Sequence, residues 1–253
     1  MKITQIRNAT LKIEFGGINF LIDPWLNKKN SDFLVHTDDP EKNLLPGPLY
    51  DLPMKPGEII KDIDFCLLTH LHFDHFSGSM LPKTLNLILQ NRNDYEKVFE
   101  LGFSRISYFR DPVLQIDEVT IHRVDGQYGE TTSISQRMGP VSGYIFTSPN
   151  EKTLYLAGDT VYYEGIEKTI DSFQPDIIVV NACDARIPEG RLIMDGSDVE
   201  KICQYSRHAT IVATHMDNVN HGYLTRTDLK EQLKESGFDD RLLIPDDGEV
   251  MLF

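Results

Sequence analysis

The apolar positions of this chain fall into short runs that are rich in Val, Ile, Leu and Phe and are bounded by Gly, Pro, Asn and Asp. Runs of this length and composition are typical of β-strands. They predict strands at residues 3–7, 11–15, 19–22, 65–69, 87–90, 105–108, 119–124, 143–147, 153–157, 177–181, 210–213, 241–244 and 249–253.

Helix-like stretches separate some of these runs, at residues 76–80, 92–101, 163–172, 196–205 and 226–236. The last stretch has the clearest boundaries, because Thr225 precedes Asp228 as in a helix cap and the stretch stops at Gly237. The strands form two groups, and the helices lie between and after them. This order predicts an α+β fold in which two sheets pack face to face and helices cover their outer sides.

One long segment, residues 24–57, has little periodicity and contains six prolines. Irregular segments of this length inside a compact domain are more often functional covers than parts of the core. We see no internal repeat, low-complexity tract or linker elsewhere in the sequence. We therefore expect a single domain over residues 1–253, with an active-site cover at about residues 24–57.

Composition narrows the range of functions. The 253 residues include 25 Lys and Arg against 39 Asp and Glu, a formal net charge of −14, and 40% are hydrophobic. A chain of this size buries roughly 70% of the surface that its unfolded form exposes, so it needs no disulfide to fold. An acidic surface repels polyphosphates. We therefore expect a small-molecule substrate and neither a nucleic acid nor a membrane as partner.

The cysteines and the N-terminus bear on location. Cys66, Cys183 and Cys203 are odd in number, widely spaced and set in apolar surroundings, which is typical of inert core thiols in a reducing compartment. The N-terminus has no apolar leader region, and no run approaches the ~18 apolar residues of a membrane span. These features predict a cytoplasmic protein.

Polar side chains follow five of the predicted strands, at the point where each strand ends. These side chains are Asp23, His70, Asp159, Asn181 and His215. Residues that collect at one edge of a sheet are held by rigid elements, which is how folded proteins position a functional site. We therefore expect these strand ends to meet around one site.

The strongest local signal is the sequence His70-Leu71-His72-Phe73-Asp74-His75. It places four potential metal ligands within six residues. Histidines two apart at a strand end can reach one ion, and Asp74 and His75, past the bend, can reach a second. Imidazole nitrogen combined with carboxylate oxygen suits zinc, iron, manganese or nickel rather than calcium.

This motif resembles the His-x-His-x-Asp-His signature of the metallo-β-lactamase superfamily. The similarity covers nearly the whole chain, because Asp23, Asp159 and His215 are similar to the family's early aspartate, bridging aspartate and last histidine ligand. Within the superfamily the chain looks most like the small cytoplasmic metal-dependent hydrolases of the ascorbate-lactonase-like branch. The resemblance implies a four-layer αββα sandwich with two mixed sheets and the metals at one edge.

The resemblance also implies a ligand set. One metal would take His70, His72 and a third histidine; the other would take Asp74, His75 and His215, with Asp159 bridging the two. The third histidine should lie at about residues 126–130, where relatives have Gly-Gln-His-Gly and this chain has Tyr128 in the histidine position.

Three interpretations of this departure stay open. Tyr128 binds the metal as a phenolate, which needs a strongly polarising ion because the free pKa is about 10. Alternatively Gln127, Glu130 or His122 substitutes, although His122 lies within an alternating strand. In the third interpretation, which we favour, the first position is weak or empty and one ion occupies the second.

Two further groups of residues support or border the expected site. Asp23 is either part of an Asp-Pro turn or, as the resemblance implies, supports a metal ligand by orienting a histidine ring or accepting its proton. Asn181 and Asp184 end another strand, and turn chemistry and a role beside the site explain them equally well.

The remaining histidines divide into two kinds. His221 follows His215 by six residues and either faces the same cleft, where it contacts substrate or acts as an acid, or caps the helix ahead of Thr225. His36 lies in the irregular segment and His208 near a helix end, and we expect both on the surface.

The chemistry implied by such a site is hydrolysis. A divalent ion lowers the pKa of bound water from ~15.7 towards about 7 and polarises a carbonyl or phosphoryl oxygen. Asp74 or Asp159 can orient the metal-bound hydroxide and take its proton. We predict a metal-dependent hydrolase, with zinc as first choice, that acts on a small ester, lactone, amide or phosphodiester. The alternative, motivated by Tyr128, is a non-catalytic metal-binding or regulatory protein with a degraded first metal site.

Overall fold

The computed structural model describes residues 1–234, 236–238 and 240–253. The first sheet contains β1 (Lys2–Arg7), β2 (Thr10–Phe15), β3 (Ile18–Ile22), β4 (Phe65–Leu67), β5 (Asn86–Leu89), β6 (Arg105–Tyr108) and β16 (Val250–Leu252). The second contains β7 (Val113–Ile116), β8 (Val119–Asp125), β9 (Ser142–Thr147), β10 (Leu154–Leu156), β11 (Ile177–Asn181), β14 (Thr210–Thr214) and β15 (Leu242–Leu243). A separate hairpin joins β12 (Arg186–Ile187) to β13 (Gly190–Arg191).

The helices are short. They are α1 (Pro56–Ile59), α2 (Tyr95–Glu100), α3 (Thr132–Met138), α4 (Glu164–Phe173), α5 (Gly196–Tyr205) and α6 (Arg226–Leu233). Single 3₁₀ turns lie at Lys42–Leu44, Gly78–Met80 and Arg92–Asp94. None of the helices in the described ranges is long and apolar enough to cross a lipid bilayer.

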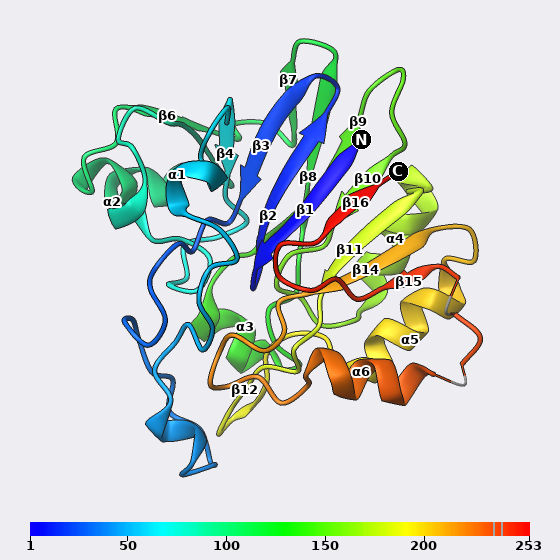
Figure 1. The fold of residues 1–253 in the computed structure, drawn as a ribbon. Helices are drawn as coiled ribbons and strands as arrows, with labels where there is room; N and C mark the ends of the chain where they lie inside the picture. Colours follow the sequence, from blue (N-terminus) through cyan, green and yellow to red (C-terminus); the bar gives the residue numbers. More distant parts are fainter. Residues whose placement is uncertain (235, 239) are drawn as a thin grey trace.

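The two sheets pack face to face, with strand orders β16-β1-β2-β3-β4-β5-β6 and β15-β14-β11-β10-β9-β8-β7 (Figure 1). Between them, the ring of Phe146 lies edge-on to Phe15 and Phe20, at centroid distances of 5.6 and 5.2 Å. Each sheet thus buries one apolar face against the other. The predicted α+β fold with two mixed sheets is confirmed.

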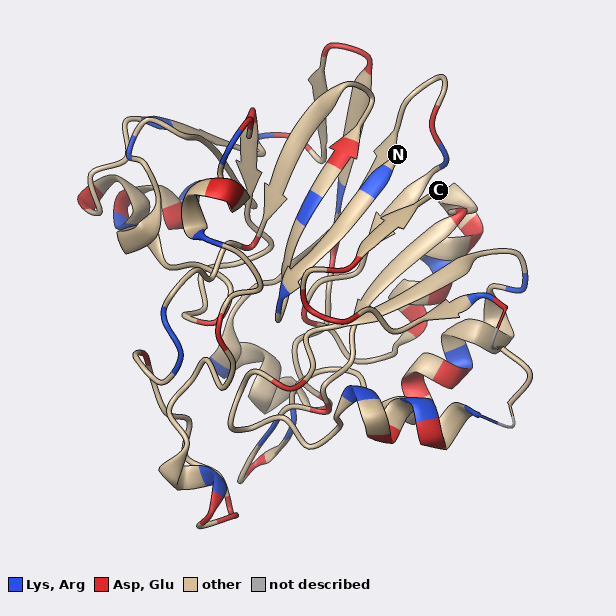
Figure 2. Cartoon of the chain, in the orientation of Figure 1, with Lys and Arg blue, Asp and Glu red and all other residues tan. Residues whose placement is uncertain are grey.

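Helices cover the outer side of each sheet, because a second apolar face remains there. On the first sheet, Ile59 of α1 and Val98 of α2 join a buried cluster with residues of β4 and β5. On the second, α4, α5 and α6 pack against β11 and β14 through a larger cluster. Charged residues are frequent in α5 and α6 and in the loops (Figure 2).

Strand direction brings distant parts of the chain to one edge. β3, β4, β5 and β6 pair in parallel, and so do β10, β11, β14 and β15. The register places Asn181 beside Thr214 and Ile22 beside Leu67. The carboxyl ends of these strands therefore finish side by side, and the loops that follow them can share one site.

Several elements differ from the sequence-based expectations. The helix predicted at residues 76–80 is only a 3₁₀ turn, because five residues cannot sustain the costly first turn of an α-helix. The helix predicted at residues 226–236 ends at Leu233, and residue 235 lies outside the described residues. The helices α1 and α3 and the strands β7, β12 and β13 were not predicted, since their runs are too short to show a period.

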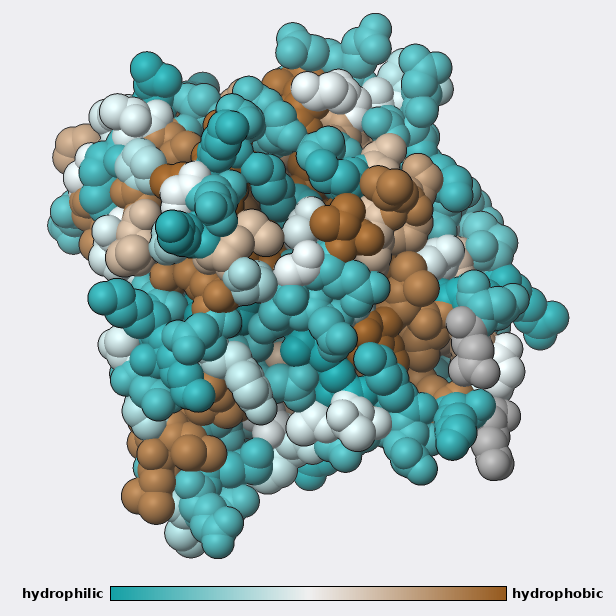
Figure 3. Space-filling view, in the orientation of Figure 1, coloured by the Kyte–Doolittle hydropathy of each residue, from teal (hydrophilic) through white to brown (hydrophobic). Residues whose placement is uncertain are grey.

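Residues 24–55 contain no regular element except one 3₁₀ turn. The base of this segment is anchored by Arg7, whose buried guanidinium donates to the carbonyls of Trp25, Asn27 and Tyr50 at 2.8–2.9 Å. Its middle part projects from the body at the lower left of Figure 1, where Figure 3 shows hydrophobic residues beside hydrophilic ones. The single-domain organisation with a cover stays a prediction.

The inter-sheet core gives a test of the architecture. Replacing Phe146 by alanine should lower the free energy of unfolding by about 3–5 kcal/mol, because it leaves a cavity between the sheets. Phe99→Ala is the matched control, since Phe99 is 54% exposed and should change stability by less than about 1 kcal/mol. Urea unfolding of both variants measures the difference, and equal losses would contradict the assigned packing.

Candidate metal centre

Five buried side chains meet at the edge where the parallel strands end. His75 Nε2 lies 3.0 Å from His215 Nε2 and 3.2 Å from Asp159 Oδ2. Asp74 Oδ2 lies 3.3 Å from His215 Nε2 and 4.0 Å from His75 Nε2. His70 Nε2 lies 3.9 Å from Asp159 Oδ2. The structure therefore brings together residues that are up to 145 positions apart in the sequence, since 215 − 70 is 145.

These distances fit a metal ion. Ligands around a tetrahedral zinc with bonds of 2.0–2.1 Å lie about 3.3–3.4 Å from one another. Two groups in the described part of the chain have all their donor atoms within 4.8 Å of one another, close enough to converge on an ion: His70 with His75 and Asp159, and Asp74 with His75 and His215. The two groups share His75, so the donors can hold one or two cations.

The backbone turns sharply where the strands deliver these ligands. Asp23 and His215 directly follow β3 and β14, and both have left-handed backbone conformations, with φ of 44° and 70°. Such values are uncommon for residues with a Cβ atom and are found where the surrounding structure imposes them. The turn at each position directs the side chain across the sheet edge.

Asp23 fixes the orientation of two histidines. Its carboxylate accepts hydrogen bonds from the Thr69 amide at 2.7 Å, from the Thr69 hydroxyl at 2.6 Å and from His75 Nδ1 at 2.8 Å. A carboxylate only accepts, so His75 Nδ1 carries a proton, and Nε2 is the ring nitrogen that faces the cluster and can bind a metal once its own proton is displaced. The hydroxyl of Thr69, having donated to Asp23, accepts from His70 Nδ1 at 3.0 Å.

The unpartnered ring nitrogen of His70 also indicates a metal site. His70 Nε2 is buried and has no hydrogen-bond partner among the described residues. An unpartnered buried nitrogen is costly. A cation between His70, His75 and Asp159 would satisfy it, so the residues present fit a divalent metal.

The other two ligands also have supporting contacts. Cys183 Sγ lies 3.4 Å from His215 Nδ1, which leaves His215 Nε2 for the cluster. Asn181 Nδ2 donates to Asp159 Oδ1 at 2.6 Å, and the Thr214 hydroxyl donates to Asn181 Oδ1 at 2.9 Å. Cys183 is buried, as expected, and it contacts the ring of a candidate ligand rather than the cluster itself.

The charges of the cluster favour a cation. Burial lowers the pKa of His75, but the carboxylates of Asp159, Asp74 and Asp23 outweigh this effect and raise it to about 10. Burial also opposes the charged forms of Asp74 and Asp159, yet the neighbouring His75 and His215 hold both carboxyl pKa values below their usual range. Without a metal, the carboxylates are thus compensated by protons on imidazoles, which a divalent cation can replace.

His72 stands beside this cluster rather than within it. Its Nε2 donates to the carbonyl of Met138 at 3.1 Å, so its Nδ1 is the nitrogen left free. Its ring lies 4.4 Å from the ring of His70 and 5.2 Å from that of Tyr128, measured between centroids. Tyr128 in turn lies 5.5 Å from His70. The buried tyrosine therefore occupies the side of His70 and His72 where the third histidine was expected.

The pKa of Tyr128 and the contacts of His122 and Glu130 bear on which residue replaces the missing third histidine. Burial, with the carboxylates of Asp159 and Asp74, raises the pKa of Tyr128 well above its usual range, which opposes a phenolate in the absence of a metal. The other candidates lie elsewhere: the His122 ring packs 5.0 Å from Phe173 in α4, between centroids, and Glu130 accepts from the Arg191 amide.

Gln127 forms its hydrogen bonds with Gly129 and Thr160. Its Nε2 donates to the carbonyl of Gly129 at 3.3 Å, and its amide nitrogen donates to the Thr160 hydroxyl. Neither Glu130 nor His122 belongs to the two donor groups found among the described residues. His36 and His208 are exposed, as expected from the sequence.

A cavity of about 270 Å³ opens above the cluster. Its polar lining includes His72, Asp74, Tyr128 and His221, and its remaining lining is apolar except for Arg137. The apolar lining consists of Leu34, Val35, Phe73, Met138, Ile187 and Leu192. The irregular segment, α3 and β12 thus all reach the site, and only the first of them was expected to.

His221 lies in this cavity. It is buried, and its Nδ1 has no hydrogen-bond partner among the described residues. Burial, the largest cause, lowers its pKa to about 4, so the imidazole is neutral at pH 7. The cap of α6 is formed by Thr225 with Asp228 instead. The geometry therefore offers His221 as a neutral hydrogen-bonding group rather than a cationic acid.

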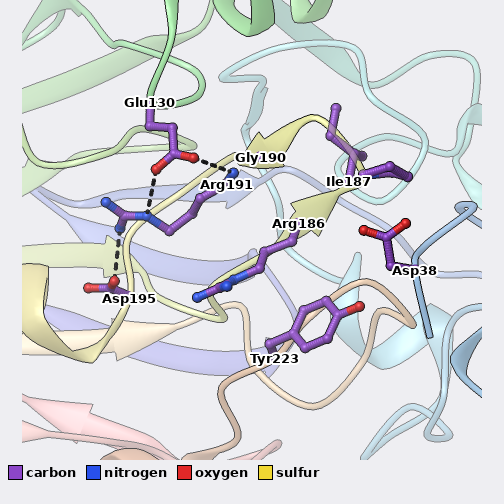
Figure 4. A pocket seen from close by; sticks show the side chains of 9 residues that line it. Asp38, Glu130, Arg186, Ile187, Gly190, Arg191, Asp195 and Tyr223 are labelled. Atoms are coloured by element: carbon purple, nitrogen blue, oxygen red, sulfur yellow. Dashed lines mark hydrogen bonds and ion pairs between the residues drawn. The ribbon is translucent and has the colours of Figure 1, made fainter.

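A second cavity, of about 550 Å³, shares Ile187 with the first. Figure 4 shows Arg191 there, between Glu130 and Asp195. Arg186 also lines it and is paired with Asp184 through two hydrogen bonds of 2.8 and 2.9 Å. Asp184 is thus an ion-pair partner outside the metal-ligand cluster.

Two supporting residues escaped the sequence analysis. Thr69 links Asp23 to His70, and Asn8 donates to the Asp74 carbonyl at 3.1 Å and lies 3.3 Å from His215 Nε2. Asn8 has a φ of 54° in the turn between β1 and β2, so its local sequence indicates only turn chemistry. Thr69 directly precedes the histidine motif, and that position was its one available signal.

The fold and the cluster together define a metallo-β-lactamase-type hydrolase. A family model described as "Beta-lactamase superfamily domain" matches residues 18–216, and the chain belongs to this family. It is 37% identical over 257 residues to the UPF0173 protein YddR of Bacillus subtilis (strain 168), with complete coverage of both chains. It is 26% identical over 226 residues to a UPF0173 metal-dependent hydrolase of Exiguobacterium sp., covering 86% of each.

A solved structure agrees with these relatives. The crystal structure of an isothiocyanate hydrolase from Delia radicum gut bacteria superposes with a TM-score of 0.93 at 35% identity, covering 100% of this chain and 99% of that one. The superfamily resemblance drawn from the sequence is confirmed, and the chain is a metal-dependent hydrolase.

The ligand set can be tested by metal content. Asp74→Asn keeps the shape of the side chain but removes an anionic donor, so we expect the metal bound per chain to fall by more than half. Asp184→Asn is the control, because Asp184 is also buried but pairs with Arg186. Elemental analysis of protein purified without added metal gives the stoichiometry. Full metal content in Asp74→Asn would refute the assignment.

Proposed function

We propose that this hydrolase acts on small, uncharged substrates that carry an apolar substituent, at a divalent metal held by Asp74, His75, Asp159 and His215. His70 and His72 would complete a second, weaker position. The nitrogen and oxygen donors favour zinc, with manganese, iron and nickel as alternatives.

The observation that carries this proposal is the cavity above the cluster. Its volume of about 270 Å³ is below that of sites for drug-sized ligands. Arg137 is the single cationic side chain among the described residues that line it, and its guanidinium donates to Glu189 at 2.6 Å. A phosphodiester would bring a negative charge into this cavity, and besides the metal no unpaired cationic side chain in the described lining would neutralise it. The lining therefore favours a neutral electrophile over a phosphodiester.

The isothiocyanate hydrolase supports a narrower substrate class. That protein is 35% identical over essentially the whole chain. An isothiocyanate is small and neutral, and its central carbon accepts a water nucleophile as the carbonyl carbon of an ester does. We propose isothiocyanates as the first substrate class to test, with esters, lactones and amides as the alternatives from the sequence.

The chain's own residues have distinct tasks in this reaction. A bound divalent cation would lower the pKa of water from ~15.7 towards about 7 and polarise the electrophile. Asp74 lines both the cluster and the cavity, where its carboxylate can accept the proton of the attacking water. Asp159, held by Asn181, is the second candidate for this role. His221 can bind a heteroatom of the substrate as a neutral imidazole.

We also propose a cytoplasmic location and a small-molecule substrate as the partner. The three cysteines are free and buried, which supports the cytoplasmic location that the sequence predicts. The net charge of −14 supports a small-molecule substrate rather than a nucleic acid. The alternative of a non-catalytic metal-binding protein is motivated by Tyr128 in the place of a histidine ligand, and substitutions of Tyr128 test it.

A substrate panel tests the proposed class. The metal-loaded protein should hydrolyse phenylethyl isothiocyanate at least tenfold faster, in kcat/KM, than a p-nitrophenyl phosphodiester, because the cavity offers no unpaired cation for the phosphate. Product amine and p-nitrophenol are measured directly. The Asp74→Asn variant is the control for contaminating activity. A preference for the phosphodiester would contradict the reasoning from the cavity lining.

Substitutions at Tyr128 distinguish an adapted tyrosine from decay. We expect Tyr128→His to add up to one metal ion per chain, since it supplies the imidazole missing beside His70 and His72. We also expect it to lower turnover severalfold, because the cavity loses the phenol. Tyr128→Phe should lower turnover without adding metal. A gain of activity in Tyr128→His would instead favour the degraded-site alternative.

A further inference from the structure

The side chain of Asn220 joins the irregular segment to the body of the protein. Asn220 is buried, and its Oδ1 accepts a hydrogen bond from the Val35 amide at 3.1 Å. Its Nδ2 donates to the Val35 carbonyl at 2.7 Å and to the Lys42 carbonyl at 3.2 Å. One side-chain amide thus holds both backbone groups of Val35 and a second point seven residues further along.

This pattern requires an amide. Pairing with the N–H and the C=O of one residue is how neighbouring β-strands bind each other, and Asn220 imitates a strand through its side chain. An aspartate of the same shape has no donor, so it would face the carbonyls of Val35 and Lys42 with a negative charge. Alanine would leave the same backbone groups without partners.

The adjacent residues strengthen this attachment. Lys42 Nζ donates to the Gly222 carbonyl at 2.8 Å. Of the hydrogen bonds that the described residues form, those linking residues 33–45 to the chain outside residues 24–57 all end on Asn220 or Gly222. The middle of the irregular segment is therefore held to the body through one short loop.

The same loop also holds a second wall of the cavity. The carbonyl of His221 accepts from the Arg186 amide at 2.9 Å, which fixes β12 and with it Ile187. Val35 and Ile187 both line the cavity above the metal-ligand cluster, and His221 itself faces it. Residues 220–222 thus connect two apolar walls with a polar group of the site.

We propose that Asn220 is a positioning residue that sets substrate specificity: by holding Val35, it fixes the apolar end of the cavity that receives the substrate's apolar substituent. This proposal rests on the proposed function for its choice of substrates. Asn220 does not touch the reacting atoms, so its loss weakens binding of the substituent more than it slows the chemical step.

The experiment compares Asn220→Ala with Asn218→Ala in the metal-loaded protein. Asn218 is equally buried in the same loop, but its side chain contacts the Met216 carbonyl and Asp247 instead of the irregular segment. Asn220→Asp adds an isosteric variant. Hydrogen exchange over residues 33–45 is measured together with KM and kcat for methyl and phenylethyl isothiocyanate.

We expect exchange over residues 33–45 to become at least tenfold faster in both Asn220 variants and to stay unchanged in Asn218→Ala. KM for the phenylethyl substrate should rise about tenfold, whereas KM for the methyl substrate and both kcat values should change less than about threefold. Unchanged exchange would overturn the attachment. Faster exchange with unchanged KM would overturn the role in specificity.

Two further measurements distinguish a failure of the proposed substrate class from a failure of the proposed role of Asn220. If neither isothiocyanate is turned over by the wild-type protein, the proposed substrate class fails, whereas hydrogen exchange still decides the attachment. If the Asn220 variants do not fold, Lys42→Met removes the Lys42–Gly222 bond from the exposed side. It should raise KM for the phenylethyl substrate in the same direction by about twofold to threefold, and an unchanged KM would overturn the proposal.

Discussion

The site depends on the burial of opposite charges in one small volume. Asp74, Asp159, His75 and His215 are almost inaccessible to solvent, and His75 and His215 each lie 3.0–4.0 Å from the other and from both carboxylates, between donor atoms. A single buried charge without a partner costs several kcal/mol, so these side chains are tolerated only together with protons or a cation between them. Asp23 orients the His75 ring, because it accepts a hydrogen bond from Nδ1 and so turns Nε2 towards the cluster. Metal binding therefore depends on the correctly folded sheet edge, because the same contacts hold the ligands in place.

Each sheet supplies only part of this cluster. Asp23 and the motif at residues 70–75 follow strands of the first sheet, whereas Asp159 and His215 follow strands of the second and Asn181 ends one. The ligand distances are consequently set by how the two sheets pack, and the inter-sheet core around Phe146 fixes that packing. A cavity opened in this core would displace one half of the ligands relative to the other, because close-packed layers transmit strain.

The metal centre and the substrate cavity have different structural origins. The ligands follow regular strands, which hold them rigidly. The apolar lining comes mostly from parts outside the sheets, namely the irregular segment, α3 and the β12–β13 hairpin. This division allows the chemistry to stay constant while the loops set the substrate. It also explains why the family match identifies the reaction type more readily than the substrate.

The sequence by itself predicted most of the strands, the two-sheet architecture and the set of strand-end side chains, because hydrophobic patterns and the motif at residues 70–75 are local. Only the tertiary structure showed which other residues hold those side chains and the cavity walls in place. Asn8 meets His215 across 207 positions and Val35 meets Asn220 across 185, and each pair exists because two loops pack at a particular register. The polar residues involved have no local period or spacing to mark them, so the sequence shows them only as turn residues. The helix α3 and the β12–β13 hairpin were missed for the same reason: their short runs gain stability from tertiary contacts.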